Sequence, residues 1–198
     1  MRKMLGFELL TVLSVLSASA LCPTTTASAA QFTGDANFLL GWKLLDRDDW
    51  RHVDDQREFG AETSWAATDW PIHIAGDMLV SADTDEIGRL DIVGSTVELA
   101  GGVRKIWSFR NFHPYAGGGL GIVSAYLKDE RIAGDDDDRD ATIGIWGGGG
   151  AFWRLGPRFN LGFATRFSRA RVHLFGERRE AGGFHAALIL GFGWPPRK

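Results

Sequence analysis

Three side chains near the carboxyl-terminal end have the types needed for nucleophilic catalysis: Ser168, His173 and Glu177. In acyl hydrolases a serine attacks, a histidine takes its proton and a carboxylate orients the histidine. Ser168 precedes His173 by five residues and alternates with bulky apolar neighbours, so we expect it on the polar face of a strand. We therefore expect no catalytic residue and no enzyme, and hydrolysis remains an alternative.

The same stretch contains a local cluster of arginines. Its members are Arg166, Arg169, Arg171, Arg178 and Arg179. Guanidinium groups bind phosphates through charge-assisted hydrogen bonds. Scattered rim arginines balanced by Glu177 and Glu180 are the other interpretation, in which Arg179 is an exposed charge. Both interpretations stay open at this level.

An acidic run, Asp135–Asp138, lies close to Asp129, Glu130 and Asp140. Carboxylate oxygens bind divalent cations, but the run lacks the alternate ligand spacing and the turn glycine of an EF-hand loop. We expect a solvated external loop around Asp135 to Asp140 and no metal site.

Two glycine runs, Gly117–Gly119 and Gly147–Gly150, could suggest a phosphate-binding loop. A G-x-G-x-x-G loop would need a glycine where Ile122 stands, and a helix after it. Strand-like residues follow instead, so we expect glycines that permit strand curvature, and no cofactor.

The overall composition limits the classes of partner. The chain has 198 residues, and its 22 basic and 25 acidic side chains give a formal net charge of −3. This balance offers no basic stripe for a phosphate backbone, so we expect no nucleic-acid partner. The counts of 26 Gly and 8 Trp are the unusual ones, because both exceed the usage of ordinary globular domains.

The first 29 residues have the parts of a secretory signal. A basic start precedes the apolar stretch Leu9–Leu21, and small residues ending at Ala29 offer a cleavage site. The apolar stretch is shorter than the ~20 residues of a spanning helix. We predict a cleaved signal peptide over 1–29 and an exported domain over 30–198. Cys22, the single cysteine, would leave with the signal, so the mature chain could form no disulfide.

Apolar and small or polar residues alternate with period two through the remaining chain, which predicts strands. The eight candidate strands are Asn37–Leu45, Phe59–Trp65, Ile72–Ser81, Thr96–Trp107, His113–Leu127, Thr142–Trp153, Phe159–Ser168 and Phe184–Trp194. The connections alternate between long and short. The long ones are Asp46–Arg57, Ala82–Gly94, Lys128–Asp140 and Arg169–Gly182. Long and short loops at opposite ends are typical of a transmembrane barrel.

Tryptophans mark one end of the predicted barrel. Trp65, Trp70, Trp107, Trp153 and Trp194 all fall where strands meet the short turns. An aromatic girdle at a membrane interface has this placement.

Side-chain size predicts which face of the sheet points inward. A soluble lipocalin-type barrel is the rival architecture, but an eight-stranded lumen is narrow and here the polar face carries many Gly and Ala. We therefore predict that the bulky apolar residues face lipid and the charged residues face the lumen. The predicted polar network of the lumen consists of Glu62, Asp77, Glu98, Arg104 and Arg166.

The segments HPYAGGGLGIV, RFNLGFATRFSRARV and AGGFHAALILGFGW resemble the small outer-membrane β-barrels of Gram-negative bacteria, the group of OmpA-like, OmpX-like and OmpW-like barrels. The resemblance implies an all-β, eight-stranded antiparallel up-and-down barrel in the outer membrane. It also implies contact with outer-membrane lipid and lipopolysaccharide, and a last strand whose Phe192 and Trp194 are read by the barrel-assembly machinery.

The functions implied by the resemblance fall into three classes. Because no reaction centre is assembled and side chains fill an eight-stranded lumen, we expect a structural or surface-interaction role. A narrow passive channel and a lipid A-modifying hydrolase are the alternatives.

Overall fold

The computed structural model describes residues 32–67, 70–87, 90–129 and 137–194, and every structural statement below concerns these residues. The predicted signal peptide over 1–29 lies outside them. The described strands are β1 (Phe32–Leu44), β2 (Asp55–Ala67), β3 (His73–Ile87), β4 (Leu90–Ile106), β5 (Phe112–Asp129), β6 (Asp137–Leu155), β7 (Phe159–Arg169), β8 (Arg171–Leu174), β9 (Glu177–Glu180) and β10 (Gly183–Trp194). Within the described ranges, no helix has the length and apolarity needed to cross a bilayer.

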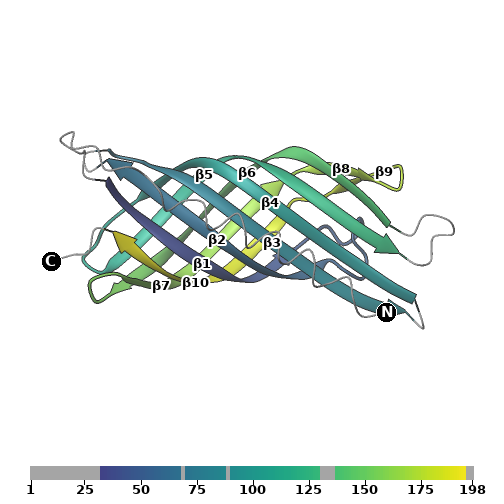
Figure 1. Ribbon diagram of the computed structural model, residues 1–198, viewed down its shortest axis with the longest axis horizontal. Helices are drawn as coiled ribbons and strands as arrows, with labels where there is room; N and C mark the ends of the chain where they lie inside the picture. The colour runs from purple at the N-terminus through teal and green to yellow at the C-terminus, as the bar shows by residue number, and fades with distance from the viewer. Residues whose placement is uncertain (1–31, 68–69, 88–89, 130–136, 195–198) are drawn as a thin grey trace, which may run out of the picture. The chain divides into compact units, whose positions relative to one another are not determined.

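Eight of these strands close into an antiparallel barrel in the order β1-β10-β7-β6-β5-β4-β3-β2 (Figure 1). The first and last strands complete the circle, since Phe38 of β1 lies opposite Ala61 of β2 and also opposite Leu190 of β10. A closed sheet satisfies its own backbone hydrogen bonds, as the interior of a bilayer requires. The predicted eight-stranded meander is confirmed.

Several strands extend further than the sequence predicts. The segments Ala82–Gly94 and Lys128–Asp140 are predicted as loops. In the structure β3 and β4 pair as far as Ile87 and Leu90, and β5 and β6 pair as far as Lys128 and Asp137. The loop prediction Ala82–Gly94 is wrong over most of its length, and the loop prediction Lys128–Asp140 is wrong at both ends, where 128–129 and 137–140 belong to strands. A backbone ladder does not need apolar side chains, so the strands continue through polar sequence in which alternation no longer marks them.

The predicted loop Arg169–Gly182 is also partly wrong, because it contains a second sheet. Strands β8 and β9 form a two-stranded hairpin outside the barrel sheet. Its turn places Phe175 at φ 54° and Gly176 at φ 76°. Two successive positive φ angles suit the tight turns that join hairpin strands.

Large apolar side chains cover the outside of the barrel. On β1, for example, Phe38, Leu40, Trp42 and Leu44 are exposed, whereas Leu39 and Lys43, which alternate with them, are buried. On β6, apolar outward residues reach Ile143, beyond which the outward positions are Ala141, Arg139 and Asp137. A soluble barrel would place its bulky side chains inside, so the lipid-facing orientation is confirmed and the lipocalin-type alternative is excluded.

The barrel interior holds the charged residues beside a small apolar cluster (Leu39, Leu79, Tyr115, Phe152, Ala187 and Ile189) and has a larger apolar group at its long-connection end. We call this larger group the outer core. It consists of Leu45, Trp50, Val53, Ile92, Val123, Ala125, Leu127, Ala170, Val172, Leu174 and Ala181. It combines inward residues of the extended strands with the β1–β2 connection and the β8–β9 hairpin. The charged residues form the candidate site.

Candidate functional site: the charged lumen

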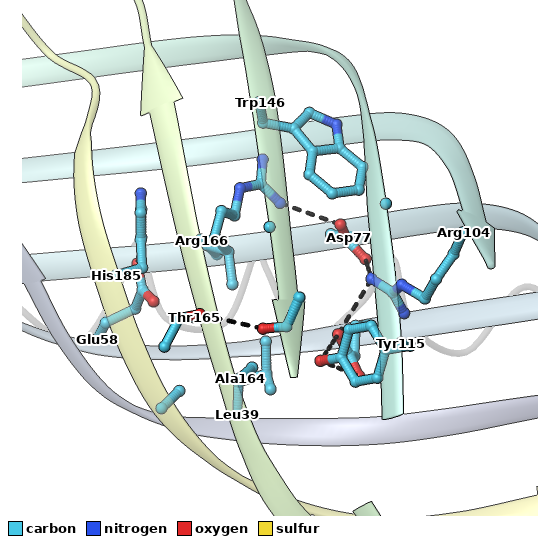
Figure 2. A pocket seen from close by; sticks show the side chains of 16 residues that line it. Leu39, Glu58, Asp77, Arg104, Tyr115, Trp146, Ala164, Thr165, Arg166 and His185 are labelled. Atoms are coloured by element: carbon cyan, nitrogen blue, oxygen red, sulfur yellow. Dashed lines mark hydrogen bonds and ion pairs between the residues drawn. The ribbon is translucent and has the colours of Figure 1, made fainter. Parts of the chain in front are cut away.

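The structure brings the five charged residues of the predicted lumen network together from four strands. Arg104 of β4 lies with its Nη2 3.1 Å from Glu62 Oε2 and 3.0 Å from Asp77 Oδ1. Arg166 of β7 reaches Asp77 Oδ2 at 3.0 Å and Glu98 Oε2 at 3.3 Å. Figure 2 shows both guanidinium groups converging on Asp77. The two arginines thereby bridge the carboxylates across the lumen.

Lys43 is a further member of this cluster, and it is absent from the predicted network. Its side chain is 1% exposed. Its Nζ donates to Thr96 Oγ1 at 2.8 Å, to Glu98 Oε1 at 2.7 Å and to Ala181 O at 2.8 Å. All three ammonium hydrogens are therefore used. Alternation with Trp42 and its apolar neighbours could have assigned Lys43 to the lumen.

The network continues to the short-turn end of the barrel through amide side chains. Asn37 donates to Glu62 Oε1 at 2.9 Å, and Asn160 donates to Asn37 Oδ1 at 3.0 Å. Arg154 forms an ion pair with Asp35 and donates through Nε to Asn160 Oδ1 at 3.0 Å. A continuous chain of polar contacts therefore runs along the lumen.

Aromatic rings support the two central arginines. The Arg104 guanidinium lies 4.9 Å from the ring centroid of Tyr115, and that of Arg166 lies 4.5 Å from the Trp146 ring. Cation–π contacts of this kind strengthen when they are removed from water. The space left between these side chains is a cavity of about 30 Å³, enough for about two water molecules. Figure 2 shows the side chains that line this cavity, with Arg104, Arg166 and Tyr115 among them.

The suggested catalytic set of Ser168, His173 and Glu177 is not assembled. Ser168 is buried in the lumen, whereas His173 is exposed on β8. Ser168 Oγ instead lies 3.0 Å from His185 Nε2, and His185 Nδ1 lies 2.6 Å from Glu58 Oε2. These distances match a serine, histidine and acid triad.

Two features of that second triad oppose hydrolysis. The Ser168 hydroxyl also donates to Glu98 Oε1 at 3.0 Å, and a carboxylate at this distance disfavours the negative charge that a serine nucleophile must develop. The triad is buried beside the small cavity between the arginines, which His185 and Glu58 help to line. With Glu98 included, its contacts join four strands, β2, β4, β7 and β10.

The five tryptophans of the predicted girdle lie at the short-turn end. Trp65, Trp70, Trp107 and Trp153 are exposed on the outside of the barrel, while Trp194 is half-buried. The Trp194 ring lies 6.4 Å from that of Phe192.

The arginines of the suggested anion-binding cluster separate in the structure. Arg166 is inside the lumen. Arg169 and Arg171 project outward, with each Nε within 3.7 Å of Glu180 Oε2. Arg179, expected as an exposed charge, is mostly buried and donates to the backbone carbonyl of Asp49.

The acidic run is described only in part. Asp135 and Asp136 lie outside the described residues. Asp138 Oδ2 accepts the backbone N–H of Phe175 at 2.6 Å, and Asp140 Oδ2 accepts that of His173 at 2.7 Å. Among the described residues, no group of three or more His, Cys, Asp or Glu side chains could hold a metal ion.

No protein-family model matches the chain. No curated protein matches it either. Solved structures do. The Ail attachment invasion locus protein of Yersinia pestis aligns with a TM-score of 0.56 and 10% identity, covering 83% of this chain and 99% of that one. Ail in complex with the heparin analogue sucrose octasulfate aligns with a TM-score of 0.54 and 13% identity over the same shares. Neisserial surface protein A aligns with a TM-score of 0.47 and 14% identity, covering 82% and 94%.

The likeness to the two Ail structures shows that the chain shares their barrel fold. Transmembrane barrels with this strand number and an apolar lipid-facing belt are outer-membrane proteins. Fold and exterior together assign the barrel to the outer membrane.

Proposed function

We propose that this chain is an outer-membrane barrel that does not conduct and that acts as a structural or surface-interaction protein. The observation that carries the proposal is the charged lumen, in which Arg104 and Arg166 bridge Glu62, Asp77 and Glu98. If the lumen is closed, the protein acts through contacts of its outer surface.

The physics of the lumen supports this proposal over the narrow channel. Charges taken out of water lose several kcal/mol of solvation each, and pairing recovers this only in good geometry. Water or ions could pass only if the arginines left their carboxylates, which would leave both partners uncompensated. We expect purified protein in planar lipid bilayers to show no steady conductance. Stepwise conductance by the unmodified barrel would contradict the proposal and favour the channel.

Outward-facing arginines above the apolar belt are the proposed contact with lipopolysaccharide. Arg169 lies opposite Ile145 in the pairing of β7 with β6 and two residues beyond Phe167, so it sits at the edge of the belt. Arg171 follows on the same face. Lipid phosphates of the outer leaflet would lie at the edge of the apolar belt, level with the guanidinium groups of Arg169 and Arg171. Guanidinium groups bind phosphates bidentately. That Ail was solved with a polysulfated ligand is consistent with an anionic partner here.

The lipopolysaccharide contact can be tested by titrating bisphosphorylated lipid A into detergent-solubilised protein. We expect Arg169→Ala with Arg171→Ala to weaken binding about tenfold or more, since each charged hydrogen bond contributes roughly 1.5–3 kcal/mol. Arg158→Ala, an exposed arginine at the opposite end, is the matched control and should bind like the wild type. Equal binding by all three proteins would exclude this surface.

The enzymatic alternative rests on the Ser168, His185 and Glu58 contacts. We propose that they are structural. A fluorophosphonate probe, which labels activated serines, should leave Ser168 unmodified in the folded barrel. Labelling that disappears in Ser168→Ala, together with a mass change in lipid A on overexpression, would establish a hydrolase.

Export and assembly are proposed on the sequence features alone. Residues 1–29 would direct export, so the purified protein should begin near Ala30. The last strand, with Phe192 and Trp194, would engage the barrel-assembly machinery. Phe192→Ala should then lower the yield of inserted barrel, while Phe159→Ala, which changes the residue paired with Phe192 on β7, should not.

A further inference from the structure

The outer mouth of the barrel is covered by a structure that is not part of the barrel sheet. The β8–β9 hairpin forms its own two-stranded sheet. Its inward side chains Val172 and Leu174 are fully buried in the outer core, together with Trp50 of the β1–β2 connection. The outer core lies above the charged network on the long-connection side. Two different kinds of packing therefore fill successive levels of the same lumen.

Carboxylates, rather than a strand ladder, attach the hairpin to its neighbours. Backbone N–H groups of His173 and Phe175 donate to Asp140 and Asp138 of β6 at 2.7 and 2.6 Å. On the other edge, the backbone N–H of Glu180 donates to Asp49 Oδ2 at 2.7 Å. Backbone groups bonded to charged acceptors form short, strong hydrogen bonds. Side chains thus hold a hairpin whose strands are paired with each other and not with the barrel sheet.

The chain just after the hairpin contacts the charged network directly. Lys43, which pairs with Glu98, donates its third hydrogen to the carbonyl of Ala181, just after β9. The Trp50 indole N–H donates to the carbonyl of Glu180 at 2.7 Å. The chain leaving the hairpin is therefore fixed to both the lumen and the β1–β2 connection.

We propose that the β8–β9 hairpin and the β1–β2 connection form a docked lid, a second closure in series with the charged network. The lid obstructs the outer side by the apolar packing of Val172, Leu174 and Trp50, beside a cavity of about 180 Å³ that Trp50, Ile92 and Arg179 help to line. The network closes the lumen below it by ion pairing. This inference rests on the proposed closed lumen and adds that either closure alone is enough to keep the barrel shut.

Thiol labelling tests the lid without reference to conduction. Leu45 lies in the outer core directly after β1, and Leu45→Cys in a Cys22→Ser background gives one reporter thiol. In a lid-less barrel, with residues 172–179 replaced by Gly-Gly, a water-soluble maleimide should react about tenfold or more faster than in the intact barrel. Asp55→Cys, at an exposed outward position, should react equally in both. Equal rates at Leu45→Cys would overturn the lid. If the shortened chain fails to fold, Val172→Asp in the full-length chain should give the same acceleration.

Planar-bilayer recordings separate the two closures. We expect no conductance from the lid-less barrel or from Arg104→Ala with Arg166→Ala, and steady conductance when both changes are combined. Conductance by the lid-less barrel alone would overturn the proposed closure by the charged network. Conductance by the arginine variant that does not increase on removal of the lid would overturn the second closure and leave the first intact. Silence of the combined variant would also overturn the series arrangement.

Discussion

Arg166 holds two carboxylates at once, since its guanidinium contacts Asp77 and Glu98 inside the lumen. Its loss leaves these buried charges with fewer partners, and breaking a buried pair typically costs about 3–5 kcal/mol. We expect Arg166→Ala to lower the heat-denaturation midpoint in detergent clearly. Arg178→Ala, at an exposed position of β9, should leave it nearly unchanged, because exposed ion pairs contribute about 0–1 kcal/mol. Equal midpoints would refute the network.

Asp140 makes the attachment of the β8–β9 hairpin sensitive to acidic pH. Backbone N–H groups of His173 and Ala141 donate to its carboxylate, which lowers the pKa of Asp140 below its ordinary value. His173 Nδ1, 4.0 Å away, and Asp138 on the same strand are the neighbouring titratable groups. A carboxyl whose pKa is lowered by folding contributes stability above its unfolded pKa, and loses it as the pH falls through its folded pKa.

Amide exchange over residues 170–181, corrected for intrinsic rates, checks this expectation. Protection should be constant from about pH 8 to pH 5 and should fall below about pH 4, where a carboxyl begins to be protonated. Asp140→Asn should reduce the pH dependence, since a neutral amide accepts the same N–H more weakly. Protection that rises on acidification would contradict the assignment.

At the scale of elements, two adjacent glycines of β4 differ in whether they have room for a side chain. A Cβ on Gly102 would meet the Gly118 carbonyl oxygen at 2.3 Å, whereas a Cβ on Gly101 would have its nearest neighbour at 4.0 Å. We expect Gly102→Ala to destabilise the barrel by about 1–3 kcal/mol, as overpacking does, and Gly101→Ala to be tolerated. Urea unfolding in detergent measures both. A larger loss for Gly101→Ala would show that the faces are reversed.

The sequence predicts a strand only where the two faces of that strand differ in polarity. Alternation identified all eight barrel strands and the inward parity of Glu62 and Arg166, because lipid requires one apolar face. It failed for the outer parts of β3 to β6, where the outward face is polar and no longer meets lipid, although inward residues such as Ile92 and Leu127 are buried in the outer core. The β8–β9 hairpin was missed for the same reason, since only Val172 and Leu174 reach an apolar environment.

The sequence predicts which charged residues face the lumen better than it predicts which of them contact one another. Which carboxylate each arginine meets depends on barrel shear and on rotamers, neither of which periodicity contains. The meeting of Ser168 with His185 instead of His173 is an example, because Ser168 lies opposite Gly183 in the β7–β10 pairing, only two residues from His185.

For the whole molecule, the even number of barrel strands puts both barrel termini at the short-turn end, which faces the periplasm in outer-membrane barrels. The hairpin and the long connections should then face the outside. In intact cells carrying Cys22→Ser, a membrane-impermeant maleimide should label Arg178→Cys and not Arg158→Cys. The reverse pattern would invert the topology.

The central claim is that charges from different strands pair across the lumen, and a double-mutant cycle between Asp77 and Arg166 tests it most directly. Unfolding free energies in detergent would be measured for the wild type, Asp77→Asn, Arg166→Met and the double variant. Contacting charges in one network show coupling energies of about 0.5–3 kcal/mol, whereas independent sites add within roughly 0.3–0.5 kcal/mol. For this buried pair we expect coupling at the upper end of that range, with the double variant more stable than the sum of the single losses implies. Additive losses would contradict the pairing.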